Sequence, residues 1–350
     1  MSVSILYVGV LTGTSLHRAR ALERLGHRVR HIEAGPPAGG WRAQLYRVGH
    51  RLHRPPDLVG AGRFLLEALG DGPWDVVWVD KGLTIAPRTL RAARRLAPGT
   101  RFVSYSPDDM TVRTRNSARY LACLPHYDLH VTTKSYNVAE LGALGAPEVL
   151  FVDNAFDPET HRPLELSADE RSAWACDAGF VGIFEEERAG FLLALARAGV
   201  PVSIRGHGWG ALREGHANLD VRNRYLEGSD YAKSINATRI NLGFLRKDAR
   251  DLQTTRSVEI PACGGFLLAE RTDEHRRLFV ESEEAEFFDS VPELVDKCRH
   301  YLAHEDERLR IAAAGRRRCL EDGYSNDERL RGVLEHLGLG AGEEVAACPA

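Results

Sequence analysis

Short apolar runs alternate with helical patterns along the first 150 residues. Residues 4–11 form a continuous apolar run, and residues 16–25 place leucine and alanine at helical spacing until Gly26. A second strand is predicted over 27–35, and such a compact strand–helix–strand unit indicates parallel pairing. The same pattern predicts four further strands and one helix, with the strands at 74–82, 101–109, 127–134 and 148–158 and the helix at 87–97.

The alternation stops at residues 161–175, which are charged, contain proline and predict no strand. It then resumes, with strands predicted at 176–184, 201–210 and 239–245 and helices at 185–199, 230–238 and 292–321. Alternating elements on both sides of a linker predict an α/β protein made of two doubly wound domains that face each other across a cleft. Ligands of such sheets bind outside the carboxyl ends of the strands, so the cleft is the expected site.

Composition narrows the function classes. The 350 residues carry a net charge of −3, which gives no general reason to expect nucleic acid or an anionic membrane as a partner. The basic run at 47–56 is interpreted as a solvated face. The six cysteines form no CxxC pair, and no apolar run approaches the ~18 residues of a membrane helix. We therefore expect a cytoplasmic protein with reduced thiols and no transmembrane segment.

Two places in the N-terminal half carry candidate chemistry. Gly13 lies in the first strand-to-helix turn, where backbone N–H groups suit an anion, although the G-x-G-x-x-G fingerprint of nicotinamide and flavin sites is absent. His17, in the helix that follows, is either a group that contacts the acceptor in the cleft or a surface histidine. Asp108 and Asp109 end a predicted strand and would bind substrate hydroxyls or act as a general base, or else form an ordinary turn. No third oxygen ligand lies nearby, so no metal is expected.

The stretch RGHGWG, residues 205–210, ends a strand in the C-terminal half. Gly206, His207 and Gly208 would let the backbone approach a ligand closely, and Trp209 would offer a ring face to a base. An ordinary glycine-rich turn is the alternative interpretation.

A second stretch, residues 251–271, places charge at the threshold of a strand. Arg256 would neutralise a ligand phosphate and Glu259 would accept hydrogen bonds from ribose hydroxyls, if residues 253–263 form a helix that shows both on one face. Gly264 and Gly265 would bring backbone amides against the phosphate. The alternative is a surface Arg–Glu pair.

Together these residues resemble a known family. The segments TTRSVEIPACGGFLLAERTDEH (254–275) and EEAEFFDSVPELVDKCRHYLAHEDERLRIAAAGRRR (283–318) look like the C-terminal half of the CgeB-like glycosyltransferases, which belong to the two-Rossmann, or GT-B, enzymes. YSPDDM (105–110) and TTKSYNVAELGALGAPEVLFVDNAFDPETHRP (132–163) resemble the N-terminal half of the same group. The resemblance covers most of residues 100–335.

The resemblance implies an acceptor domain at 1–160, a linker at 161–175 and a nucleotide-sugar domain at 176–322. It also implies a helix at 323–338 that crosses back to the N-terminal domain, before a disordered tail at 339–350. The donor would be a UDP-, GDP- or dTDP-sugar used as co-substrate, with no cofactor and no metal. The acceptor would be a hydroxyl on a glycan, lipid, protein or small molecule.

The resemblance also implies roles for residues. Related retaining enzymes carry two glutamates separated by seven residues; Glu259 matches the second, and Asp251 stands where the first would be. We take Asp109 and Asp251 as the catalytic candidates. The donor diphosphate would contact an Arg/Lys pair, Arg246 and Lys247, or alternatively Arg188 and Arg256, with Thr255 in the same motif.

Glycosyl transfer is the leading hypothesis, with a retaining outcome. A nucleotide-sugar 2-epimerase with the same architecture is an alternative, although it needs a carboxylate and histidine set that the sequence does not reveal. A non-catalytic protein that binds nucleotide-sugar or glycan is the third.

Overall fold

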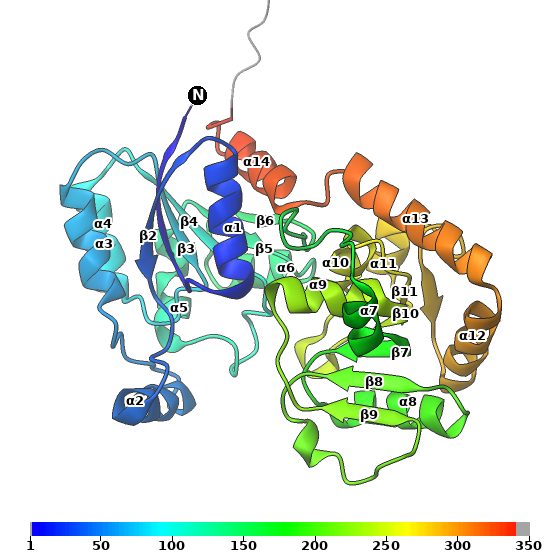
Figure 1. The fold of residues 1–350 in the computed structure, drawn as a ribbon. Helices are drawn as coiled ribbons and strands as arrows, with labels where there is room; N and C mark the ends of the chain where they lie inside the picture. Colours follow the sequence, from blue (N-terminus) through cyan, green and yellow to red (C-terminus); the bar gives the residue numbers. More distant parts are fainter. Residues whose placement is uncertain (1, 341–350) are drawn as a thin grey trace, which may run out of the picture. The chain divides into compact units, whose positions relative to one another are not determined.

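The computed structural model describes residues 2–340, and the chain divides into two compact units (Figure 1). The first unit runs to Asp153 and resumes at Asn326, and the second extends from Asn154 to Ser325. The second unit is therefore one continuous segment, inserted into the chain of the first.

The first unit is built on a six-stranded parallel sheet with the order β2-β1-β3-β4-β5-β6. Its strands are β1 (Ser4–Gly9), β2 (Arg28–Glu33), β3 (Val76–Asp80), β4 (Arg101–Ser106), β5 (Leu129–Thr132) and β6 (Val149–Phe151). Every residue of β3 is buried, because helices cover both faces of the sheet and leave no solvated side. This is why the central strands read as continuous apolar runs in the sequence, whereas the edge strand β2 is partly exposed and carries charged residues.

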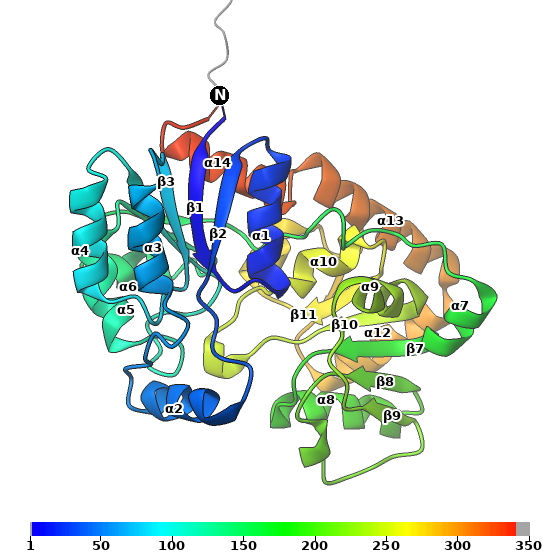
Figure 2. The same ribbon diagram turned by 60° about the vertical axis from the view of Figure 1, so that its left-hand side comes forward.

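Two helix layers cover that sheet (Figure 2). On one face α1 (Gly13–Arg24) packs beside α14 (Asn326–His336), where Leu22 shares a core with Leu330 and Val333. On the other, α3 (Ala61–Gly70) packs beside α4 (Pro87–Leu96). The remaining helices are α2 (Gly40–Arg51), α5 (Ala118–Cys123), a 3₁₀ turn (Leu124–His126) and α6 (Asn137–Ala143).

The second unit repeats the architecture with a parallel sheet of order β12-β11-β10-β7-β8-β9. Its strands are β7 (Cys176–Val181), β8 (Val202–Arg205), β9 (Leu219–Arg222), β10 (Thr238–Gly243), β11 (Leu267–Glu270) and β12 (Glu286–Phe288). Its helices are α7 (Ala168–Trp174), α8 (Glu186–Arg197), α9 (Gly228–Ala237), α10 (Arg256–Ala262), α11 (Asp273–Leu278), α12 (Val291–Ala303) and α13 (Glu305–Glu321), with 3₁₀ turns at Trp209–Ala211 and Lys247–Ala249. The strand order reverses between β7 and β10, which makes their carboxyl ends the expected ligand site.

The predicted α/β class with two doubly wound sheets is confirmed. The region predicted as a linker differs, because α7 lies within residues 161–175 and packs against α9 in the second unit. This helix opens with a capping box in which Ser167 and Glu170 bond to each other's backbone N–H groups. It buries no side chain fully, so it leaves no apolar periodicity to detect.

Two further expectations concern the C-terminal tail and the absence of a transmembrane segment. Of the tail predicted to be disordered, residues 341–350 lie outside the described residues, and Leu339 packs against the first unit's core. Within residues 2–340, none of the helices has both the length and the apolar character that crossing a bilayer requires.

A glycine pair tests how tightly α13 is packed. A Cβ at Gly315 would lie 2.2 Å from the carbonyl oxygen of Glu284, whereas a Cβ at Gly190, on α8 in the same unit, meets nothing within 4 Å. Gly315→Ala should therefore lower the free energy of unfolding by about 1–3 kcal/mol through overpacking. Gly190→Ala should leave it unchanged or raise it by up to about 1 kcal/mol, from helix propensity. Denaturant titration measures both, and equal effects of the two substitutions would contradict this packing.

Candidate functional site

Three arginines converge where the second sheet reverses its strand order. Arg188 lies in the first turn of α8, Arg246 follows β10, and Arg256 begins α10. Glu185 contacts two of them, since its Oε1 lies 3.3 Å from Arg188 Nη1 and accepts a hydrogen bond from Arg246 Nε at 3.1 Å. The guanidinium groups of Arg188 and Arg256 lie 5.5 and 5.6 Å from the ring centroid of Phe180. We call Arg188, Arg246 and Arg256 the arginine cluster.

Charge in this cluster is incompletely compensated. Burial, followed by repulsion from Arg256, lowers the pKa of Arg188 to about 10, although Glu185 and Asp251 oppose the shift. The side chain of Arg188 is 2% exposed, and its Nε and Nη2 atoms have no hydrogen-bond partner within residues 2–340. Buried donors without partners are costly, and an anion with several oxygens would satisfy them. The cluster is therefore suited to a phosphate or diphosphate.

Glu259 lies three residues beyond Arg256, on the same short helix. Its carboxylate is almost fully buried and accepts a hydrogen bond from the Tyr231 hydroxyl at 2.8 Å. His161 Nε2 lies 3.7 Å from the other carboxylate oxygen, while His161 Nδ1 accepts the backbone N–H of Asp157 at 3.0 Å. Since Nδ1 accepts, the ring proton lies on Nε2 and faces Glu259. A carboxylate has about four acceptor positions, so this one retains capacity for ligand hydroxyls.

An exposed aromatic pair lies beyond Glu259. The rings of His207 and Tyr225 stack, with centroids 5.5 Å apart and an interplanar angle of 6°. Partial burial, followed by the charges of Glu227 and Glu259, raises the pKa of Tyr225, so the Glu259 carboxylate lies within electrostatic reach of this ring. Tyr225 is 55% exposed and offers a flat surface to a planar ligand.

Trp209 does not present the open ring face that the sequence suggested. Its side chain is buried in the core of the second unit, and its indole N–H donates to the Gly182 carbonyl at 2.8 Å. The neighbouring glycines bring backbone against backbone: Gly206 has φ +145°, and a Cβ there would lie 1.9 Å from the same Gly182 oxygen. Gly208 has φ +85°. The RGHGWG stretch thus fixes the loop after β8 against the loop after β7 and leaves His207 at the surface.

The predicted role of Gly264 and Gly265 at a phosphate requires correction. Both precede β11 and so lie at the amino edge of the sheet, at the opposite ends of the strands from the arginine cluster. A Cβ at Gly265 would lie 2.6 Å from Ile235 and 2.9 Å from Asn241. Packing of the α10–β11 turn accounts for this glycine.

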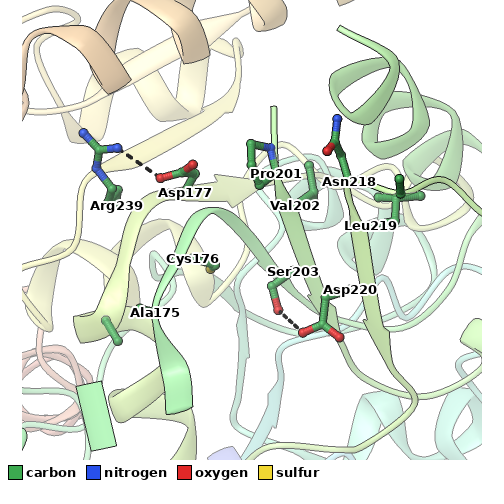
Figure 3. A pocket seen from close by; sticks show the side chains of 12 residues that line it. Ala175, Cys176, Asp177, Pro201, Val202, Ser203, Asn218, Leu219, Asp220 and Arg239 are labelled. Carbon is green, nitrogen blue, oxygen red and sulfur yellow. Dashed lines mark hydrogen bonds and ion pairs between the residues drawn. The ribbon is translucent and has the colours of Figure 1, made fainter. Parts of the chain in front are cut away.

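A hollow of about 500 Å³ at the same amino edge is a less suitable ligand site (Figure 3). It is bounded by the ends of β7, β8 and β10, and an ion pair between Asp177 and Arg239 at 3.0 Å closes one side. Doubly wound sheets bind ligands at the carboxyl ends of their strands, not at this edge.

The side chains of the predicted pair, Arg246 and Lys247, contact different carboxylates. Arg246 turns to Glu185, while the Lys247 ammonium pairs with the Glu270 carboxylate, which also accepts the Leu245 N–H at 2.6 Å. Two other predicted residues flank the cluster. Asp251 contributes a negative charge to the surroundings of Arg188, and the Thr255 carbonyl accepts the N–H of Glu259 at 2.9 Å, at the start of α10.

The candidate residues predicted in the N-terminal half lie at the carboxyl edge of the first unit's sheet. Gly13 begins α1 with φ +57°, and His17 lies half-buried on the same helix. Asp109 is fully buried, and its carboxylate accepts hydrogen bonds from Thr111 at 2.7 Å and Asn137 at 3.0 Å. These contacts give Asp109 a structural role in the turn.

Asp108 is the more exposed acid of the pair, and its carboxylate lies 2.5 Å from the Lys81 ammonium. Burial raises the pKa of Asp108, but the charge and hydrogen bond of Lys81 outweigh it and hold that pKa below the ordinary value. Asp108 is therefore a carboxylate at neutral pH. Within residues 2–340, no three His, Cys, Asp or Glu side chains are grouped to hold a metal ion.

Comparisons with known proteins bear on the fold and on part of the second unit. A family model described as "Glycosyl transferase-like" matches residues 188–335, which include the arginine cluster and Glu259. A search of curated proteins finds no match. Solved structures, in contrast, match along almost the whole chain.

An α-glucosyltransferase in complex with UDP and a 13-mer DNA has a TM-score of 0.67, with 14% identity over 97% of this chain and 100% of that one. Anabaena HepE in complex with UDP and glucose has a TM-score of 0.62, with 12% identity over 96% and 99%. The fold is that of the GT-B glycosyltransferases. A Listeria monocytogenes protein named as a UDP-N-acetylglucosamine 2-epimerase aligns less well, with a TM-score of 0.56 and 12% identity over 98% and 99%.

In this GT-B chain, His275 anchors α10, the helix that carries Arg256 and Glu259. Its Nδ1 lies 2.6 Å from the Glu270 carbonyl, to which it donates, and its Nε2 lies 2.7 Å from the Ser257 hydroxyl, from which it accepts. Burial lowers the pKa of His275 from 6.5 to about 4, so the folded protein holds a neutral ring.

This burial predicts acid sensitivity of the second unit. As pH falls from 6.5 to about 4, the unfolded chain binds a proton at His275 that the folded chain does not, so stability decreases over that window. The contribution is roughly 3 kcal/mol. Denaturant titrations across this pH window should show that the free energy of unfolding depends less on pH in His275→Gln than in wild type. The control His304→Gln, at an exposed position, should have the same pH dependence as wild type. Identical pH profiles for wild type and His275→Gln would refute the role of this ring.

Proposed function

We propose that the chain is a glycosyltransferase that holds a nucleoside-diphosphate sugar at the carboxyl edge of the second sheet. One observation carries the proposal: the arginine cluster, Glu259 and the His207–Tyr225 stack follow one another in that order. A nucleoside diphosphate has the same sequence of chemical groups, namely diphosphate, ribose and base.

This order is inferred from one hydrogen bond and from charge interactions that link neighbouring groups of the second unit. The charge of Arg256 acts on both Arg188 and Tyr231, Tyr231 donates to Glu259, and the charge of Glu259 reaches Tyr225. Because Arg256 and Glu259 are three residues apart on α10, their Cβ atoms lie about 5–6 Å apart on one face. That spacing suits a phosphate and the adjoining ribose hydroxyls.

Glycosyl transfer requires stabilisation of the negative charge that develops on the diphosphate leaving group. In the proposed reaction the acceptor oxygen bonds to the anomeric carbon, and the bond from that carbon to the diphosphate breaks. The diphosphate leaves with the electron pair, and the acceptor proton passes to a base. Fixed guanidinium groups stabilise such a leaving group in a site that excludes water, so we propose that transfer needs no divalent cation.

The finer assignments rest on the resemblance. We propose that Asp251 lies near the sugar and that the outcome is retaining, as in the related retaining enzymes that carry a glutamate at this position. Asp108, the more exposed acid of the pair, remains the candidate for contacting the acceptor, a hydroxyl on a glycan, lipid, protein or small molecule. We further propose a cytoplasmic location. UDP is the first ligand to test, since the similar glucosyltransferase and HepE structures contain it.

Glu259 should be required for nucleotide binding. A ligand at a hundred times its Kd stabilises a protein by about 2.7 kcal/mol, which a thermal-shift panel of UDP, GDP and dTDP detects. We expect one nucleotide to raise the Tm of wild type equally with and without magnesium, and to have little effect on Glu259→Ala. Glu321→Ala, an exposed substitution on α13, serves as control. No shift with any nucleotide would refute the proposed function, and a shift only with magnesium would refute metal independence.

The arginine cluster should recognise the diphosphate rather than the nucleoside. Arg256→Ala should weaken UDP binding about tenfold or more, because a charge-assisted contact is lost, and leave the weaker binding of uridine unchanged. Arg276→Ala, at an exposed position on α11, should change neither. Calorimetric titration of UDP and uridine into the three proteins makes the comparison. Equal losses for UDP and uridine in Arg256→Ala would mean that this arginine supports the fold of the site, not the phosphates.

A nucleotide-sugar 2-epimerase is the second candidate, favoured by the carboxylate–histidine contact between Glu259 and His161 at this site. The two reactions differ in their need for an acceptor. An epimerase converts its UDP-sugar to the C2 epimer with no acceptor present, whereas the proposed transferase returns the donor sugar unchanged in configuration. Product analysis by NMR distinguishes them.

A further inference from the structure

The helix α2 carries its large apolar side chains on the face turned to solvent. Trp41, Leu45 and Val48 on the helix and Leu52 at its C-cap are 69%, 44%, 51% and 69% exposed, and α2 buries none of its residues fully. Their spacing of four, three and four residues places them in one line along the helix. We call these four residues the α2 stripe.

The opposite face of α2 is the one that packs on the first unit. Ala43, Tyr46, Gly49 and His50 are half-buried, and a Cβ at Gly49 would lie 2.5 Å from Pro56. A surface helix normally turns its apolar stripe to the core and its polar face to water. Here small and polar residues face inward, so the fold of the first unit does not explain the α2 stripe.

Positive charge surrounds the stripe. The sequence of α2, GWRAQLYRVGHR, contains three arginines and no acidic residue. At 100° per residue, Arg42 and Arg51 fall on the two sides of the stripe, and Arg42 lies 5.6 Å from the Trp41 ring centroid. Long cationic side chains beside an apolar stripe can extend to phosphate headgroups while their methylene groups remain among apolar atoms.

We propose that α2 is an interfacial helix that docks the protein on an anionic lipid surface. An apolar stripe containing tryptophan, bordered by arginines and free of acids, matches the acyl boundary and negative headgroups of such a surface. This replaces the interpretation of residues 47–56 as only a solvated face. The protein as a whole carries a charge of −3, so the attraction is local to this helix.

The position of α2 gives the docking a direction. It follows β2 and stands beyond the carboxyl end of that strand in both views (Figures 1 and 2). Docking through the α2 stripe would turn the carboxyl edge of the first sheet toward the lipid. The inference uses residues of the first unit alone and stands independently of the proposed function.

Vesicle flotation of the full-length protein tests the proposal. We expect wild type to float with vesicles of phosphatidylcholine and phosphatidylglycerol, to bind pure phosphatidylcholine vesicles about tenfold less, and to lose binding as salt is raised. No flotation, or equal flotation with both vesicle types, would overturn it.

Matched variants assign the binding to α2. Leu45→Ser/Val48→Ser should reduce the partition coefficient about tenfold or more, with the Tm unchanged because both side chains are exposed. Arg42→Gln/Arg51→Gln should remove the preference for anionic vesicles. Leu96→Ser, at an exposed position on α4, should bind as wild type. If the stripe variant floats like wild type, or if light scattering shows that the stripe instead holds a dimer that Leu45→Ser/Val48→Ser dissociates, the proposal is wrong.

Discussion

Parallel pairing of all six strands in each sheet is the constraint on which the rest of the structure depends. Each strand must be reached again from the same end, so helices return over both faces and bury them. The carboxyl ends then meet at one edge, together with the loops that follow them. In the second unit this edge collects Glu185, Arg246 and α10, which come from separate parts of the sequence.

This constraint also explains how much of the fold was predictable. Every strand predicted between residues 4 and 245 is present. The central strands are buried on both faces and read as continuous apolar runs, whereas the partly exposed β2 was predicted from its place in a strand–helix–strand unit. The strand β9 was missed because it is largely exposed and contains two charged residues, and β12 because one of its three residues is a glutamate. The helix α7 was interpreted as part of a linker because it has polar residues on all sides. The capping-box pattern of Ser167 and Glu170 in the sequence would have indicated the start of a helix.

Some residues of the candidate site could also be predicted from the sequence, and others could not. Arg256 and Glu259 were recognisable because a single helix turn joins them, and local spacing is what a sequence displays. Tyr231 and His161 were not, because each reaches Glu259 across a long sequence separation through tertiary packing. The ligand-binding roles predicted for Trp209 and Gly265 were wrong for a physical reason. An aromatic ring and a glycine suit a ligand site or a tightly packed core equally well, and only the burial seen in the structure distinguishes these two roles.

The path of the chain through the two units has a consequence for biosynthesis. The helix α14 covers the apolar side of α1, yet it follows the whole second unit in the sequence. At about 5–20 residues per second, a ribosome spends roughly ten to thirty seconds on the segment between Asp153 and Asn326. Throughout that time Leu22 and its neighbours lack their final cover. All helices and strands of the second unit, by contrast, lie in the one continuous segment Asn154–Ser325. The second unit is therefore expected to finish folding first, and the first unit to close last, when α14 arrives.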